Sequence, residues 1–502
     1  MMNSVKLPAS WCLLAMGDIS DVVGGGTPRT NNQDCFGGNI PWITPADLST
    51  HKDKGISKGA RSITEIGYTE SGAKWLPKGS ILFSSRAPIG YVAIAECPLT
   101  TNQGFKSFVP HKGISSEYVY YWLSSAKQLA EELASGTTFL EISGSKAALI
   151  PFPLAPSTEQ TRIVEKLEEL LSDLDAGVAE LKAAQRKLGQ YRQSLLKAAV
   201  EGALTASWRA QHTPTETGAQ LLERILAERR ARWEAQQLAK FEAQGKAPPK
   251  DWRKKYPEPV RPEISGLSEL PKGWVWSSIG QCFQVAVGAT PSRKDPSYWV
   301  GKIPWVSSGE VRFSRITATK EMITEQGLNN SSTQINPIGS VLLGMIGEGK
   351  TRGQVAILDV PAANNQNCAA IWVSETDIPP EYVYYWLWSQ YEETRRGSSG
   401  NNQPALNKSI VERISFPIAP PDEMKQIVRQ VDRELNAAAE QERAIEYALK
   451  QSAAQRKNIL KAAFSGQLVP QDPDDEPAAV LLERIRAQRA AATIKAPPRR
   501  RP

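Results

Sequence analysis

The sequence is an ordered tandem repeat, and this feature limits what the chain can fold into more than any other. Its 502 residues match themselves at an offset of about 263 positions. The matched segments are LPASW (7–11) with LPKGW (270–274), GNIPW (38–42) with GKIPW (301–305), GYVAI (90–94) with GQVAI (353–357), EYVYYW at 117–122 and 381–386, FPLAP (152–156) with FPIAP (416–420), LLKAAVEGAL (195–204) with ILKAAFSGQL (459–468), and LLERI at 221 and 481. Chance does not produce matches in one conserved order, so the chain contains two related copies.

The first part of each copy, about 150 residues long, has the pattern of a mixed α/β domain. Short apolar runs alternate with Gly, Pro, Asn and Ser, and Ser80–Phe83, Gly90–Ala95 and Ser340–Leu343 read as strands. Each EYVYYW segment reads as an amphipathic helix. We expect its aromatic side chains to pack in a core rather than to stack on bases.

The second part of each copy is predicted to be one long helix. Apolar residues fall mostly at three- and four-residue spacings, with some at seven, from Ile163 to Leu195 and from Ile427 to Leu449, without an intervening proline. Such heptad spacing favours a coiled coil. About 40 residues at a rise of ~1.5 Å give a rod of roughly 60 Å. Ser157-Thr158-Glu159-Gln160 resembles a capped helix start.

The net charge of +7 is unevenly placed. Residues 224–255 hold ten Lys/Arg and four Asp/Glu, and residues 484–502 hold seven Lys/Arg and no acid, whereas the mixed domains are near balance. This pattern permits nucleic-acid binding without demonstrating it, because solvated basic tails would look the same. We expect LLERILAERRARW to be helical, a proline-rich basic linker to follow it, and the tail beyond about Ala492 to lack fixed structure.

These patterns predict an α+β fold with an internal pseudo-two-fold repeat. Two α/β domains are separated by two long antiparallel coiled-coil helices, because related units most often pack about a two-fold axis. The predicted order is a first α/β domain (1–157), a long helix (158–205), a helical then proline-rich linker (206–266), a second α/β domain (267–420), a second long helix (421–469), and a short helix with a basic tail (470–502).

Composition excludes several classes of protein. The five cysteines are scattered without a C-x-x-C pair and there are only three histidines, which argues against disulfide scaffolds and zinc modules and fits a reducing cytoplasm. No apolar run reaches the ~18 residues of a membrane span, and the start does not resemble a secretory signal. We therefore expect a cytoplasmic protein without a membrane partner.

A pseudo-dimer on a rigid rod suits a ligand that is itself extended and two-fold. Duplex DNA read as two separated half-sites is such a ligand, with the rod setting the half-site spacing. In this interpretation the two mixed domains recognise the half-sites and the helices set the distance between them.

The ordered motifs together resemble the specificity subunit of type I restriction-modification systems. The resemblance covers nearly the whole chain. It rests on the LP-x-x-W segments, the TP pairs (27–28 and 290–291), the IPW segments, the NQ pairs (102–103 and 365–366), the FP-x-AP segments, the heptad helix and the LLKAAF-like helix end of each copy. It implies that residues 1–157 and 267–420 are target-recognition domains, that the two long helices are spacers, and that each domain reads one half of a bipartite double-stranded DNA target. It also implies that two methyltransferase (M) subunits clasp the helices and domains and that two motor-nuclease (R) subunits complete the enzyme. The subunit itself would be non-catalytic and hold no cofactor, with S-adenosylmethionine, ATP and Mg on the partners.

Two segments imitate catalytic motifs. Asp377–Glu381 spoils the spacing of an amino-methyltransferase motif and reads better as a capped start of the EYVYYW helix. Gly344–Thr351 matches the phosphate-binding pattern G-x-x-x-x-G-K-[ST]. A true phosphate loop opens a helix, whereas strand-like Gln354–Leu358 follows here. We read this loop, which is longer than its counterpart SSRAPIG in the first copy, as a DNA-reading hairpin.

Direct reading of bases favours Arg or Lys for guanine and Asn or Gln for adenine, on loops that a sheet holds. The predicted DNA-binding residues are Thr27, Arg29, Thr30, Arg86, Asn102, Gln103 and Lys106 in the first copy and Thr290, Arg293, Lys294, Lys350, Arg352, Asn365 and Gln366 in the second. The TP and NQ pairs occur in both copies, so we favour turn-holding or phosphate contact for them. Residues that differ between copies, such as Arg86 against Lys350 and Arg352, are better candidates for base reading.

Two other classes of function remain open from the sequence. The chain could be an NTPase that uses Gly344–Thr351, in which case the isolated chain would bind ATP. It could also be a coiled-coil adaptor that binds only proteins, although a symmetric scaffold does not need two divergent domains.

Overall fold

The computed structural model describes residues 7–136, 140–347, 350–396 and 406–494. The chain divides into two compact units, and each contains parts of both sequence copies. Unit 1 comprises Met1–Ala183 with Ile445–Pro502, and unit 2 comprises Ala184–Ala444. The mixed domain of unit 1 is called module 1 (residues 7–156) below, and that of unit 2 is called module 2 (residues 267–420). The predicted disordered tail beyond Ala492 lies largely outside the described residues.

Module 1 consists of short strands and short helices, as the punctuation of its sequence predicts. In chain order it contains β1 (Cys12–Ala15), α1 (Met16–Ile19), β2 (Ser20–Gly24), η1 (Gln33–Cys35), β3 (Phe36–Ile43), α2 (Pro45–Ser49), β4 (Gly55–Ile56), β5 (Arg61–Ile63), α3 (Glu65–Thr69), β6 (Ile81–Ser85), β7 (Ile89–Ala95), β8 (Thr100–Thr101), β9 (Lys106–Pro110), α4 (Ser116–Ser125), α5 (Lys127–Leu133), α6 (Gly144–Ala147) and β10 (Pro151–Leu154).

Module 2 repeats this order, except that the 3-10 helix η4 takes the place of α2 and that the further 3-10 helix η5 precedes α12. It contains β11 (Val275–Ser278), α10 (Ile279–Cys282), β12 (Gln284–Val287), η3 (Pro296–Tyr298), β13 (Trp299–Val306), η4 (Ser308–Glu310), β14 (Ser314–Ile316), β15 (Glu321–Ile323), α11 (Glu325–Asn329), β16 (Val341–Gly344), β17 (Val355–Leu358), β18 (Ala363–Asn364), β19 (Cys368–Trp372), η5 (Val373–Glu375), α12 (Pro380–Ser389), α13 (Tyr391–Arg396), α14 (Lys408–Arg413) and β20 (Ser415–Ile418).

The sheets of the two modules have matching topologies. A five-stranded sheet has the order β2-β9-β6-β7-β4 in module 1 and β12-β19-β16-β17-β14 in module 2. A three-stranded sheet has the orders β5-β3-β8 and β15-β13-β18, and the ends of each module pair as β1-β10 and β11-β20. The β6–β7 and β16–β17 pairs are antiparallel hairpins, as predicted. The tandem repeat in the sequence is therefore a repeat of fold.

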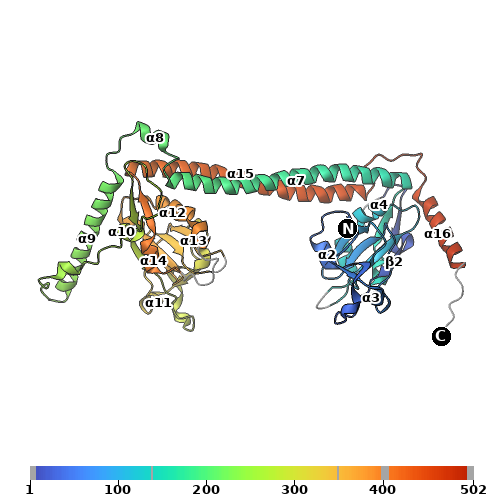
Figure 1. The fold of residues 1–502 in the computed structure, drawn as a ribbon, viewed down its shortest axis with the longest axis horizontal. Helices are drawn as coiled ribbons and strands as arrows, with labels where there is room; N and C mark the ends of the chain where they lie inside the picture. Colours follow the sequence, from blue (N-terminus) through green and yellow to red (C-terminus); the bar gives the residue numbers. More distant parts are fainter. Residues whose placement is uncertain (1–6, 137–139, 348–349, 397–405, 495–502) are drawn as a thin grey trace. The chain divides into compact units, whose positions relative to one another are not determined.

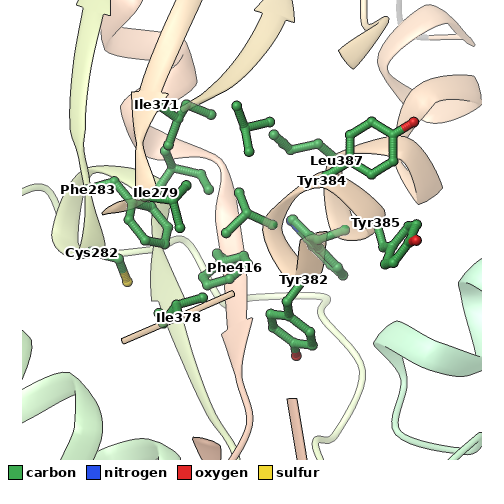
Figure 2. Packing of buried hydrophobic residues seen from close by; sticks show 14 of the residues in the cluster. Ile279, Cys282, Phe283, Ile371, Ile378, Tyr382, Tyr384, Tyr385, Leu387 and Phe416 are labelled. Carbon is green, nitrogen blue, oxygen red and sulfur yellow. The ribbon is translucent and has the colours of Figure 1, made fainter. Parts of the chain in front are cut away.

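The EYVYYW segments are core helices, which confirms the packing prediction. Helix α12 lies against β16 and β17 in module 2 (Figure 1). Figure 2 shows Tyr382 of this helix close to Phe416, at a centroid distance of 5.7 Å. The Tyr382 hydroxyl donates to the carbonyl of Pro417 at 3.1 Å, and Tyr118 does the same to Pro153 at 2.9 Å.

Two helix starts differ from the prediction. Asp377 does not cap α12, because Pro379 is the N-cap residue and Asp377 instead pairs with Arg224 at 2.8 Å. The first long helix, α7, begins at Ser157, and the Gln160 side chain bonds the module through Ser115 N and Ala155 O. The capping pattern predicted that the Gln160 side chain would bond the helix start, whereas it bonds the module.

The long helices α7 (Ser157–Val200) and α15 (Pro421–Ala463) pair antiparallel in each unit. In unit 1, Asp175 pairs with Arg456, and Arg162 near the start of α7 pairs with Asp475, which follows α15, at 2.6 Å. In unit 2, Arg192 pairs with Glu442 at 2.6 Å. Apolar residues of both helices also join the buried core clusters of the units. Each module is therefore continuous with a segment of the helix pair.

The LLERI helices pack on the module of the other sequence copy. The segment between the copies contains α8 (Ala206–Gln211), α9 (Gly218–Ala243) and η2 (Trp252–Lys255), and α16 (Ala478–Ile494) ends the described chain. Leu221 and Ile225 of α9 lie in the core of module 2, and Leu481 and Ile485 of α16 lie in the core of module 1. Within the described ranges, every helix is too short or too polar to cross a lipid bilayer.

A buried glutamate at the start of each long helix connects the helix to the LP-x-x-W segment of its module and to the segment that follows the other long helix. In unit 2, Glu423 accepts hydrogen bonds from Trp274 of the LP-x-x-W motif at 2.9 Å and from Thr205 at 2.7 Å. In unit 1, Glu159 accepts from Trp11 at 2.9 Å and from Gln471 at 2.5 Å. In both units, the tryptophan lies in the segment before the long helix that carries the glutamate. The other donor, Thr205 or Gln471, lies just after the other long helix of that unit.

Candidate nucleic-acid interface

The TP loop and the NQ turn contact one another in both modules. In module 2, the Thr290 hydroxyl donates to Oε1 of Gln366 at 2.6 Å. In module 1, the backbone N–H of Gln103 donates to the Thr27 hydroxyl at 3.4 Å. Two predicted pairs that are far apart in the sequence therefore form one surface, called the recognition loops below.

The tryptophan of the IPW strand holds this surface in place. Nε1 of Trp42 donates to the carbonyl of Gly26 at 3.0 Å, and Nε1 of Trp305 donates to the carbonyl of Ala289 at the same distance. Each bond is made just before the TP threonine. Because Trp42 and Trp305 are themselves buried, the loops are anchored to the three-stranded sheet.

The asparagines of the NQ turns hold their own turns. Oδ1 of Asn102 accepts from the backbone N–H of Gly104 at 2.9 Å, and Oδ1 of Asn365 accepts from that of Asn367 at 3.1 Å. This is the side-chain-to-backbone pattern of an Asx turn. The geometry thus favours the turn-holding interpretation for both asparagines, whereas Gln103 and Gln366 are exposed beside them.

Each module places one guanidinium on the first aromatic ring of its IPW strand. In module 2, Arg293 lies 3.8 Å from the centroid of Trp299 and pairs with Glu321 at 2.9 Å between Nη2 and Oε2. These bonds from Arg293 hold the pKa of Glu321 below its ordinary value. In module 1, Arg61 lies 3.9 Å from the centroid of Phe36.

Arg61 and Glu321 occupy equivalent positions, because each begins the strand that pairs with the IPW strand. The cation therefore comes from the strand in module 1 and from the TP loop in module 2. Our sequence reasoning missed Arg61. A strand-by-strand alignment of the copies would have found it, because the position holds opposite charges in the two copies.

The other predicted residues lie at or near these loops in different settings. Arg29, Thr30, Lys294 and Lys350 are exposed. Arg86 and Lys106 both approach Glu141, at 3.5 and 3.7 Å. These two cations belong to a local charge cluster in module 1.

Arg352 does not join the recognition loops. It lines a cavity of about 290 Å³ together with Trp386 of α12, Glu393 of α13, and Gln390 between the two helices. Its Nε is buried and has no hydrogen-bond partner among the described residues. The structure thus places Arg352 beside the helices α12 and α13. Its predicted role in base reading stays a prediction.

The phosphate-loop interpretation of Gly344–Thr351 lacks its helix. Residues 348 and 349 lie outside the described part of the chain, but β16 ends at Gly344 and the next element is the strand β17, beginning at Val355. The described residues thus form the two strands of a hairpin, as predicted, rather than a strand followed by a helix. Among the described residues, His, Cys, Asp and Glu side chains form no group of three or more that could hold a metal ion.

The fold and the paired surfaces define a class of protein: two related modules, each with a sheet-anchored loop surface, joined to an antiparallel helix pair. Comparison with known proteins gives the family. Residues 8–183 and 271–451 match the type I restriction modification DNA specificity domain, and the chain belongs to this family.

Curated relatives cover most of the chain. The MjaIX specificity subunit of Methanocaldococcus jannaschii is 30% identical over 426 residues, which are 84% of this chain and 85% of the relative. The EcoDI specificity subunit of Escherichia coli is 24% identical over 394 residues, which are 76% of this chain and 78% of the relative. The predicted family resemblance is confirmed, and members with these names are recognition subunits without a catalytic role.

Solved structures share the fold. A chain from a structure of type I R-M complex assembly and conformational transition aligns with a TM-score of 0.65 at 16% identity, covering 92% of this chain and 99% of that one. The HsdS subunit from Thermoanaerobacter tengcongensis aligns with a TM-score of 0.51 at 15% identity, covering 93% and 99%. The predicted fold class is confirmed by these likenesses and by the matching sheets.

Proposed function

We propose that this chain reads a bipartite double-stranded DNA target, with each module reading one half-site. The observation that carries the proposal is that the two modules hold the same loops in the same way but differ in the side chains beside those loops. Both modules anchor the same pair of loops with the same tryptophan bond. The exposed positions on that frame differ, with Arg61 in one module where Glu321 stands in the other. Two readers of different half-sites require this combination.

The helix pair α7 and α15 is proposed to set the gap between the half-sites and to dock two methyltransferase subunits. Long helices with exposed polar faces suit both roles, and the family assembles into such complexes. Two motor-nuclease subunits would complete the restriction enzyme. S-adenosylmethionine, ATP and Mg are expected on these partners, and the complex is expected to work in the cytoplasm, which fits the five free cysteines.

The test is methylation mapping in a host without its own methylases that expresses the full chain with the methyltransferase encoded beside it. We expect a split motif, with two short half-sites around a fixed gap and one modified base on each strand. A single uninterrupted motif from an assembled complex would refute the division of labour between the modules.

A matched pair of variants assigns the halves. Arg61→Ala should relax the motif in one half-site only, and Arg293→Ala should relax it in the other only. The two residues are suitable controls for each other because each places its guanidinium on the equivalent ring. If both variants relaxed the same half, or neither relaxed any, the modules would not be independent readers.

A further inference from the structure

The IPW strand of each module carries a bulge beside the recognition loops. In module 2, Trp299 and Ile303 both lie opposite Ile323, so residues 300–302 stand out of the β13–β15 ladder. In module 1, Phe36 and Ile40 both lie opposite Ile63, so residues 37–39 stand out in the same way. Bulges of this kind re-aim side chains at functional edges.

The middle residue of the bulge is glycine in both copies for a steric reason. A Cβ on Gly301 would lie 2.1 Å from the carbonyl oxygen of Ile323, and a Cβ on Gly38 would lie 2.5 Å from that of Ile63. The backbones therefore follow the same path in both modules. Differences in the other bulge residues do not come from a different backbone.

The first residue of the bulge has a left-handed backbone in both copies. Gly37 has φ +81° and Val300 has φ +62°. Glycine adopts this conformation readily, whereas a β-branched residue is strained in it. Module 2 therefore keeps a costly residue at a position where module 1 has the residue that the backbone favours.

Packing within the chain does not offset this strain. The Val300 side chain is 94% exposed. A Cβ placed on Gly37 would meet nothing within 4 Å, so the equivalent site in module 1 is equally open. A strained apolar side chain held in water indicates a contact outside the chain, because strain of this kind concentrates at functional sites.

The neighbours of Val300 indicate where that contact lies. The preceding residue, Trp299, forms the ring under Arg293, and its Nε1 donates to the carbonyl of Ser292 in the TP loop at 3.2 Å. Lys302 of the same bulge is exposed. Val300 thus stands on the rim of the recognition loops of module 2.

We propose that Val300 is a specificity-determining residue that contacts the 5-methyl group of a thymine in the half-site read by module 2. The inference rests on the proposed function. Apolar side chains recognise thymine in the major groove through this methyl group, which the other three bases lack. Gly37 cannot make such a contact, so the half-site read by module 1 would not depend on it.

The test combines a protein change with a DNA change in the complex of the full chain with its methyltransferase. Binding is measured on the mapped target and on duplexes in which each thymine of one half-site is replaced by uracil, which lacks only the methyl group. For the unmodified chain, one replacement in the second half-site should weaken binding about fourfold, the value expected for one buried methyl-sized group. For Val300→Gly, the same replacement should have no effect.

Two readouts separate the proposal from a structural role. Val300→Gly should unfold at a higher temperature than the unmodified chain, because it removes backbone strain, while it loses selectivity in the second half-site alone. Uracil scanning of the first half-site is the matched control and should give the same result for both proteins.

The proposal is overturned if no uracil replacement acts differently on the two proteins, or if the second half-site contains no thymine on either strand. Loss of complex assembly in Val300→Gly would also overturn it, since the contact would then be with protein. Failure of the proposed function would be distinguishable, because the unmodified chain would then give no split motif.

Discussion

Replacing Glu423 by glutamine should destabilise unit 2 much more than replacing Glu159 by glutamine destabilises unit 1. The two glutamates occupy equivalent positions, and each is only 1% exposed. Each accepts a bond from the LP-x-x-W tryptophan at 2.9 Å. The two glutamates differ in the charge of a further hydrogen-bond donor, so they can be compared with each other within one chain.

In unit 2 the further partner is a cation. Arg209 donates to Glu423 at 2.5 Å, and its side chain is only 23% exposed. Breaking a buried ion pair by removing one charge costs ~3–5 kcal/mol. Because glutamine still accepts one bond and Arg209 reaches some water, we expect a loss of about 2–4 kcal/mol for Glu423→Gln.

In unit 1 the further partner is the neutral side chain of Gln471, and the nearby Arg162 pairs with Asp475 instead. Burial raises the pKa of Glu159, although the bonds from Trp11 and Gln471 oppose this shift. Neutralising this side chain should therefore cost only about 1 kcal/mol at neutral pH. Since the raised pKa favours proton uptake in the folded state, the unmodified chain should gain stability relative to Glu159→Gln as pH falls through the folded pKa.

The assay is amide hydrogen exchange of the full chain, read on peptides from the start of α15 and from the start of α7. This method reports the two units separately within one sample. Adding Arg209→Met to Glu423→Gln should recover part of the loss, because it removes the unpaired cation. Equal losses at the two sites, or a larger loss for Glu159→Gln, would refute the reasoning.

Three further outcomes are expected. Hydrogen bonds from Arg162 lower the pKa of Asp475. The stability that these bonds contribute should be fully present above the ordinary carboxyl pKa of about 4 and should be lost as pH falls through the lowered value. Over that range, the difference in urea stability between the unmodified chain and Asp475→Asn should shrink. Trp305→Phe removes the bond to Ala289, worth about 1 kcal/mol, and should relax only the second half-site in methylation mapping. Arg352→Ala should weaken binding by ~1–3 kcal/mol at one half-site alone, as expected for a residue that reads a base; an unchanged motif with a changed melting temperature would instead assign the side chain to packing in the cavity beside α12.

Much of the fold was predictable because the repeat carries it. The hairpins, the core helices and the long helices all follow from apolar periodicity, and the two copies corroborate each other. The helix starts were less predictable. The capping pattern at Ser157–Gln160 is real in the sequence, but the Gln160 side chain bonds Ser115 and Ala155 of the module. Local propensity does not register such competition from tertiary contacts.

The loops that form the candidate site were predictable from the sequence, whereas some of the side chains beside them were not. Thr290 and Gln366 were selected separately and the fold brings them together. Arg61 was missed because its contact with Phe36 crosses between strands, so that only a strand-by-strand alignment of the two copies singles the position out. Val300 was missed for a different reason, since a left-handed backbone at a valine is a property of the bulge and not of the residue.

The repeated motifs of the two copies are explained by contacts between copies. Gly202, after the first long helix, has φ +74°, and a Cβ there would lie 2.6 Å from Pro271 of the second LP-x-x-W motif. Gly466, after the second long helix, has φ +71°, and a Cβ there would lie 2.3 Å from Pro8 of the first. Each glycine is thus required twice, by its backbone and by a proline from the other copy. In each unit, the LP motif of one copy is therefore matched to the glycine of the other copy. This exchange explains why both copies contain both motifs, whereas residues beside the recognition loops, such as Arg61 and Val300, differ between the copies.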